Sequence, residues 1–179
     1  MVKRFGKGTM LIPAPREVDE IMKLIPKGKL ITINQIREIL AKRHKTNTTC
    51  PITTGIFARI AAHAAEEDKR NGAKNITPWW RTIREGGILN EKYPGGMENQ
   101  KRLLESEGHK IVQKGKRYIV TDFEKKTCRY QDSYIAKHKI KLYAKSVCFF
   151  HGCAHSCYYA SSIDDVYIIY IHNISVTRD

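Results

Sequence analysis

The sequence lacks any long apolar run. No segment approaches the roughly 18 apolar residues of a membrane-spanning helix, and the basic N-terminal stretch has no apolar core of the kind found in signal peptides. We therefore expect a cytoplasmic protein with no membrane partner. At 179 residues the chain is long enough for one ordinary domain and an appendage, but too short for two large domains.

Cysteine is scarce in the first two thirds of the chain, because four of the five cysteines follow residue 125. An odd number in this distribution does not fit the disulfide framework of a small secreted protein. Cys148, Cys153 and Cys157 alternate with two histidines, but their spacing differs from the CxxC pairs of zinc sites. We expect no metal and no cofactor, and these three cysteines, with His151 and His155 between them, remain weak metal-ligand candidates.

Acidic residues are outnumbered, since 18 Asp and Glu stand against 32 Lys and Arg and give a net charge of +14. Residues 1–125 hold 25 of the basic and 14 of the acidic residues, so the excess is concentrated there. A basic surface of this kind attracts a polyanion such as the DNA backbone. The alternative is a basic surface that serves only solubility.

Apolar spacing and turn residues predict a mainly α-helical domain with a small β-hairpin over residues 14–125. The expected elements are helices near 16–25, 33–43, 55–70 and 97–107 and a hairpin near 110–122. Thr32 and Gln35 are typical of a capping box at the start of the second helix. Residues 1–13 are expected to form a basic N-terminal arm. Residues 126–179 are expected to form a tail or small appendage of unknown role, in which VYIIYIHNISV predicts a strand.

The third expected helix is rich in alanine, which lets a helix backbone approach a partner closely. Arg59 and His63 lie four residues apart and so share one face of this helix. The residues expected to face the core are Ile56, Phe57, Ile60 and Ala64.

The most specific pattern runs from Ile76 to Gly108. It contains Pro-Trp-Trp-Arg, a Gly-Gly pair, the turn Tyr-Pro-Gly-Gly and a helix that ends in Leu-Leu-Glu-Ser-Glu-Gly. This order resembles the active-site segment of the O6-alkylguanine-DNA alkyltransferases (methylated-DNA-protein-cysteine methyltransferases), in which Pro-Cys-His-Arg-Val precedes a Tyr-x-Gly-Gly turn and a Leu-Leu-x-x-Glu-Gly helix end. The resemblance implies the winged helix-turn-helix-like fold of the alkyltransferase C-terminal domain.

The residues that carry the family's chemistry are replaced in this chain. Trp79 stands at the position of the acceptor cysteine and Trp80 at that of the adjacent histidine, whereas Glu107 matches the glutamate of the relay. Alkyl transfer needs a thiolate nucleophile and a base that activates it, and an indole supplies neither. The resemblance therefore implies the alkyltransferase-like branch, in which we expect no catalytic residue and no methyltransferase activity.

The resemblance also assigns a DNA-binding site. It implies that the helix near 55–70 enters the minor groove, that Arg59 fills the space of a flipped base, and that Trp79 stacks on that base. For Asn71 a helix-capping role is an equal alternative, and of the two tryptophans Trp80 is expected in the core. The complete predicted DNA- and lesion-binding set is Thr32, Arg59, Asn71, Trp79, Arg81, Tyr93, Gly95 and Gly96.

These observations predict a protein that binds O6-alkylguanine in double-stranded DNA without alkyl transfer. By resemblance it marks the lesion for DNA repair, with nucleotide excision repair proteins as further partners, and we expect a monomer. Two alternatives remain open. One is an active methyltransferase that uses another cysteine, and the other is a winged-helix DNA-binding regulator.

Overall fold

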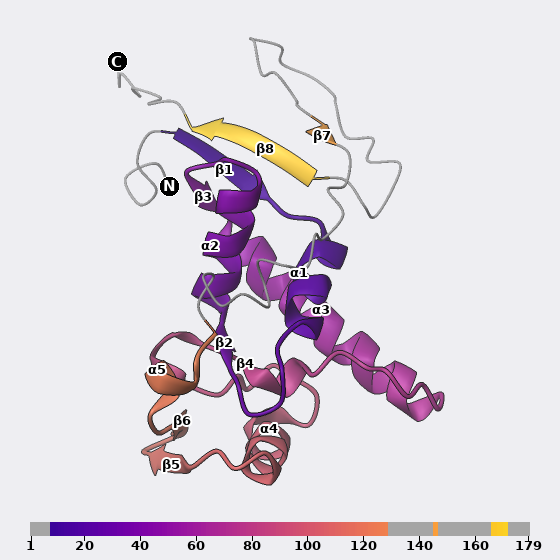
Figure 1. The fold of residues 1–179 in the computed structure, drawn as a ribbon, viewed down its shortest axis with the longest axis vertical. Helices are drawn as coiled ribbons and strands as arrows, with labels where there is room; N and C mark the ends of the chain where they lie inside the picture. Colours follow the sequence, from indigo (N-terminus) through magenta and orange to yellow (C-terminus); the bar gives the residue numbers. More distant parts are fainter. Residues whose placement is uncertain (1–7, 129–144, 147–165, 172–179) are drawn as a thin grey trace, which may run out of the picture.

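The computed structural model describes residues 8–128, 145–146 and 166–171 and has the expected mainly α-helical fold with small strand pairs (Figure 1). Its helices are α1 (Pro15–Lys23), α2 (Ile33–Arg43), α3 (Pro51–Arg70), α4 (Gly96–Ser106) and α5 (Phe123–Lys126), with 3-10 turns η2 (Trp79–Arg81) and η3 (Glu85–Gly87). Its strands are β1 (Gly8–Ile12), β2 (Ile31–Thr32), β3 (Thr48–Thr49), β4 (Thr82–Ile83), β5 (Ile111–Lys114), β6 (Arg117–Val120), β7 (Lys145–Ser146) and β8 (Val166–Ile171).

Most of the predicted elements are confirmed, and the second helix shows why. At its start the Thr32 hydroxyl accepts a hydrogen bond from the Gln35 backbone N–H at 3.2 Å, while the Gln35 side chain accepts one from the Thr32 N–H at 2.9 Å. This reciprocal cap satisfies two backbone donors that the first turn of a helix leaves open. The predicted hairpin is the antiparallel pair β5–β6.

Helix α3 begins at Pro51, earlier than the expected start near residue 55. Proline suits the first turn of a helix because its backbone angle is already helical and its missing N–H is not needed there. The Thr54 hydroxyl donates to the Cys50 carbonyl oxygen at 2.7 Å. Thr53 and Thr54 therefore lie inside the first turn of this helix.

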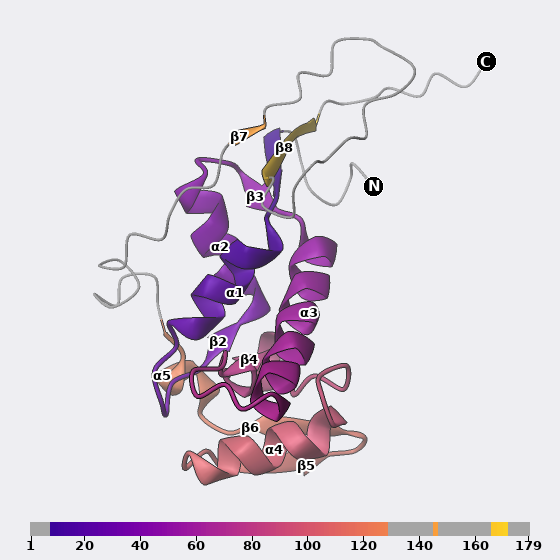
Figure 2. The same cartoon turned by 90° about the vertical axis from the view of Figure 1, so that its right-hand side faces the viewer.

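The N-terminal arm is the second difference, because residues 8–12 form strand β1. This strand pairs in parallel with β3 and antiparallel with β8, in a sheet of order β3-β1-β8-β7. The strand expected near the C-terminal end is confirmed over residues 166–171. In both views this sheet lies at one end of the molecule, and α4 with the hairpin lies at the other (Figures 1 and 2). The domain boundary after residue 125 stays a prediction.

The core is built where α1, α2 and α3 pack together, with a second cluster under the hairpin (Figure 2). Helix α3 contributes Thr54, Ala58, Ala61, Ala62 and Ala65 to this packing. The expected inward stripe is therefore wrong for three of its four residues, because Ile56 and Ile60 are 40% and 49% exposed and Ala64 is exposed as well. The isoleucines and the alanines of α3 both recur at helical spacing. Four of the alanines face the core because their smaller side chains allow α3 to pack closer to α1. Phe57 is half-buried.

None of the helices in the described part of the chain is long and apolar enough to cross a membrane.

Candidate nucleic-acid interface

The solvent-exposed side of α3 carries a stripe of isoleucines. The sequence pattern assigned Ile56 and Ile60 to the core and did not include Ile52. Ile52, Ile56 and Ile60 are 56%, 40% and 49% exposed and follow one another at a spacing of four residues. Arg59 and His63 are exposed beside them. Contiguous apolar patches on a protein surface are typical of interaction sites, so this stripe is a candidate interaction face. We call these five residues the outer face of α3.

This outer face continues into the Tyr-Pro-Gly-Gly turn. His63 Nε2 lies 3.4 Å from the Lys92 carbonyl oxygen, at the start of that turn. Gly95 and Gly96 have φ angles of 72° and 67°, which residues with side chains rarely adopt. The Gly96 N–H donates to the Tyr93 carbonyl oxygen at 2.8 Å and closes the turn. Four predicted site residues (Arg59, Tyr93, Gly95 and Gly96) thus lie on neighbouring elements.

Trp79 lies in the core next to this turn. Its side chain is 0% exposed, and its indole N–H donates to Glu66 Oε1 at 3.2 Å. The ring stands nearly perpendicular to Tyr93 and Trp80, with centroid distances of 5.6 Å and 5.9 Å. The expectation that Trp80 is the core tryptophan is wrong, because Trp80 is half-buried. Tyr93 is 3% exposed, and burial raises the pKa of its hydroxyl. The hydroxyl therefore keeps its proton at neutral pH.

Glu107, which matches the relay glutamate, is a hydrogen-bond centre. Its carboxylate accepts from the Trp80 indole N–H at 2.8 Å, from Arg81 Nε at 3.0 Å and Nη2 at 2.8 Å, and from the Gly28 N–H at 3.2 Å. Burial raises the pKa of the Glu107 carboxyl, but these donors outweigh it and hold the pKa below its ordinary value. Trp80 thus serves this carboxylate as a hydrogen-bond donor, and its indole has no basic nitrogen.

Arg81 faces inward. Besides its ion pair with Glu107, its Nη1 donates to the Ile25 carbonyl oxygen at 2.6 Å, and its side chain is only 13% exposed. The guanidinium also lies over the Trp80 ring, 5.6 Å from the centroid. This arrangement joins the end of α1 to the end of α4. The structure therefore gives Arg81 a fold-stabilising position, and its role in DNA binding stays a prediction.

Thr32 and Asn71, the remaining predicted residues, both occupy helix ends. Thr32 is buried and caps α2, as described above. Asn71 is exposed as the C-terminal cap of α3, and the following Gly72 takes the left-handed conformation at φ 85°. This position fits the capping alternative for Asn71.

His109 is a buried side chain that sequence reasoning missed. It is 3% exposed, and burial lowers its pKa. The nearby Lys126 and Arg81 charges lower the pKa further, whereas Glu107 opposes them. The fold therefore favours the neutral imidazole.

We predict that stability falls in two stages as the pH decreases. The pKa of folded His109 lies below its ordinary 6.5, so the unfolded chain takes up this proton first and stability starts to fall near pH 6.5. The pKa of folded Glu107 lies below its ordinary 4.5, so its contribution is complete above pH 4.5 and is lost below it. Urea denaturation from pH 8 to about pH 3 covers both stages. His109→Gln should flatten the first one, and an unchanged slope between pH 7 and pH 5 would contradict this assignment.

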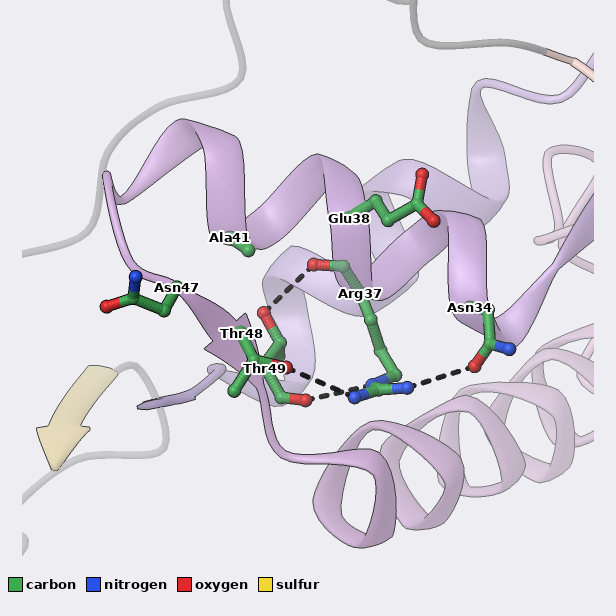
Figure 3. Close-up of a pocket in the computed structure, with 7 residues that line it drawn as sticks. All are labelled: Asn34, Arg37, Glu38, Ala41, Asn47, Thr48 and Thr49. Atoms are coloured by element: carbon green, nitrogen blue, oxygen red, sulfur yellow. Dashed lines mark hydrogen bonds between the residues drawn. The ribbon is translucent and has the colours of Figure 1, made fainter. Parts of the chain in front are cut away.

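A surface pocket of about 270 Å³ lies elsewhere, between α2 and β3 (Figure 3). Its lining residues are Asn34, Arg37, Glu38, Ala41, Asn47, Thr48 and Thr49. Arg37 donates from Nε to the Thr49 carbonyl oxygen at 2.8 Å, from Nη1 to Asn34 Oδ1 at 3.0 Å and from Nη2 to Thr48 Oγ1 at 3.2 Å. The guanidinium fastens β3 to α2. No predicted lesion-binding residue lines this pocket.

The described residues contain two cysteines, Cys50 and Cys128. Cys50 is the N-terminal cap residue of α3, and Cys128 is buried after α5, so neither occupies the acceptor position. The metal-ligand candidates Cys148, Cys153 and Cys157 lie outside the described residues. Within the ranges that are described, no group of three or more His, Cys, Asp or Glu side chains is arranged to hold a metal ion.

Comparison with known proteins gives a family match. Residues 13–109, more than half of the chain, match the family described as 6-O-methylguanine DNA methyltransferase, DNA binding domain. Among solved structures, S. pombe Atl1 in complex with damaged DNA containing O6-carboxymethylguanine is 21% identical, with a TM-score of 0.45. S. pombe ATL in complex with DNA is 22% identical, with a TM-score of 0.47. Each alignment covers 64% of this chain and 94% of the other. No curated protein matches the chain significantly.

Proposed function

Because the chain belongs to the 6-O-methylguanine DNA methyltransferase family through its DNA-binding domain, we propose that it binds O6-alkylated guanine in double-stranded DNA without transferring the alkyl group. It docks α3 in the minor groove, flips the alkylated base and holds it. The bound protein marks the lesion for DNA repair, with nucleotide excision repair proteins as partners. It acts in the cytoplasm as a monomer and without a cofactor.

The outer face of α3 is the observation that carries this proposal. Arg59 is exposed beside Ile56 and Ile60, so a cation capable of entering the base stack lies next to two exposed aliphatic side chains. Proteins that bind the minor groove use this combination, because apolar side chains pack against the sugars and wedge base steps apart while arginine enters the groove. Four alanines of α3 face the core, namely Ala58, Ala61, Ala62 and Ala65, so the large apolar side chains exposed on this helix are the isoleucines.

Binding without transfer is supported by what surrounds the acceptor position. Trp79 has no nucleophilic atom, and the carboxylate that serves the family's relay is occupied by Trp80 and Arg81. A residual activity through Cys50 would need the alkyl group to reach the start of α3 instead of the position next to Tyr93.

Duplex DNA with a radiolabelled O6-methyl group tests the absence of transfer. We expect the protein to bind this duplex and all label to remain on the DNA, while an active methyltransferase of the family, as the positive control, takes up one label per molecule. Label on this protein would contradict the proposal. Cys50→Ser would then show whether Cys50 is the acceptor.

A further inference from the structure

The hydrogen bond between Trp79 and Glu66 joins the acceptor position to α3. The indole N–H is the one polar group of the Trp79 side chain, and it donates to Glu66 Oε1 at 3.2 Å. Glu66 is half-buried on the last turns of α3, with a side chain that is 19% exposed. An indole donor and a carboxylate acceptor form a charge-assisted bond, which is stronger than a bond between two neutral groups.

In this arrangement the position that should receive a base is closed. Trp79 is 0% exposed and Tyr93 is 3% exposed, so neither ring offers a free face on which a flipped guanine stacks. Stacking requires that the Trp79 ring become accessible, and a rotation of this ring toward solvent stretches or breaks the bond to Glu66. The indole N–H that this bond occupies is the same donor that Trp79 offers to a bound base.

Glu66 lies on the same helix that is proposed to dock in the DNA groove, so it links the buried position of Trp79 to DNA binding. It follows Arg59 by seven residues, which is close to two helical turns, so both lie near the same side of α3 about 10 Å apart. The helix that enters the groove therefore carries both the side chain that replaces the flipped base and the side chain that holds Trp79.

We propose that Glu66 is a latch that holds Trp79 in the closed position and thereby sets how strongly the protein discriminates alkylated from unmodified DNA. This inference rests on the proposed function. Lesion binding draws on the open population only, so its apparent affinity is reduced by the fraction of molecules that are open. Binding to an unmodified duplex leaves the base in the stack and does not require opening.

The free protein provides the first test. In Glu66→Ala, the indole N–H of Trp79 should exchange with solvent about 10-fold faster, as expected for the loss of one hydrogen bond to a charged group. The indole N–H of Trp80, which donates to Glu107, serves as the internal control and should be unchanged. Nitrogen-15 NMR resolves the two signals. Equal exchange of the Trp79 N–H in the variant and the parent protein would overturn the latch.

Binding provides the second test, with two duplexes that differ in a single O6-methylguanine. Glu66→Ala should raise the ratio of lesion to unmodified affinity about 10-fold. Glu67→Ala removes the same charge from the neighbouring, exposed position and should leave the ratio unchanged. Glu66→Gln keeps an acceptor oxygen, so its affinity ratio should lie between those of Glu66→Ala and Glu67→Ala. If the alanine variant does not fold, the glutamine variant provides the test. A ratio in both Glu66 variants equal to that of Glu67→Ala would overturn the proposal.

The two tests separate this inference from the proposed function. Faster Trp79 exchange in Glu66→Ala of a protein that shows no lesion preference would show that Glu66 holds Trp79 closed, but it would refute the proposed function and the effect of the latch on discrimination. A clear lesion preference that neither Glu66 variant changes would support the proposed function and refute the latch.

Discussion

Arg59→Ala is expected to weaken binding to a duplex with one O6-alkylguanine by roughly 10- to 100-fold, because base flipping costs a few kcal/mol that an inserted side chain helps to recover. Arg59 is exposed on α3, so its truncation should leave the fold intact. Fluorescence anisotropy with labelled duplexes measures the affinity, and circular dichroism confirms the fold.

Two variants control for the loss of charge. Arg102→Ala removes the same charge from an exposed position on α4, and we expect it to cost only a small, salt-dependent part of the affinity. Arg59→Lys keeps the charge but lacks the planar guanidinium, so it should recover only part of the loss. If Arg59→Ala and Arg102→Ala weaken binding equally, Arg59 acts as a general cation and its insertion into the duplex is refuted.

Trp79→Ala is expected to lower the free energy of unfolding by about 3–5 kcal/mol, as for other large aromatic side chains deleted from a core. Trp79 has no exposed surface, contacts Tyr93 and Trp80 edge to face, and bonds to Glu66. Urea denaturation monitored by circular dichroism gives the change. This loss makes the alanine variant unsuitable for measuring the contribution of stacking to lesion binding.

Trp79→Phe is the matched variant, because it keeps a ring for Tyr93 to pack against and removes the indole N–H. It should lose less than half as much stability as Trp79→Ala and retain a face for a flipped base. If Trp79→Ala instead changes the free energy of unfolding by less than about 0.5 kcal/mol, the side chain behaves as a surface residue and its core position is refuted.

Local signals in the sequence were sufficient to predict most of the architecture. The capping box at Thr32 and the Gly-containing turns mark element boundaries through contacts a few residues apart, and these boundaries are confirmed. The family resemblance read from the segment Ile76–Gly108 is confirmed by the match over residues 13–109. These features depend on residue order and spacing, which a single sequence contains in full.

The face of α3 could not be predicted from periodicity. Two pairs of residues on α3 have the same spacing of four residues. One pair is Ile56 and Ile60, and the other, on the opposite side of the helix, is Ala58 and Ala62. Hydrophobicity favoured the isoleucines for the core, whereas the close packing of α3 with α1 requires the smaller side chains. A helix that presents its larger apolar residues to solvent is expected where those residues have a function.

Long-range pairing was the other feature beyond the sequence pattern. Strand β1 is a short run after a basic stretch, and its partner β8 lies more than 150 residues later. The roles of Trp79 and Trp80 depend on long-range partners as well, since Glu66 and Glu107 decide how each indole is held. Composition around two adjacent tryptophans contains no information about which of them is buried.

The affinity of the unmodified protein for two duplexes of identical sequence, one with a single O6-methylguanine and one without it, tests the central claim most directly. Stacking of one base on an aromatic side chain contributes about 1–3 kcal/mol, so the lesion duplex should bind roughly 5- to 150-fold more tightly. Both affinities should fall steeply as salt increases, because lysine and arginine displace counterions from the backbone. Equal affinities for the two duplexes would contradict lesion recognition and favour a DNA-binding regulator.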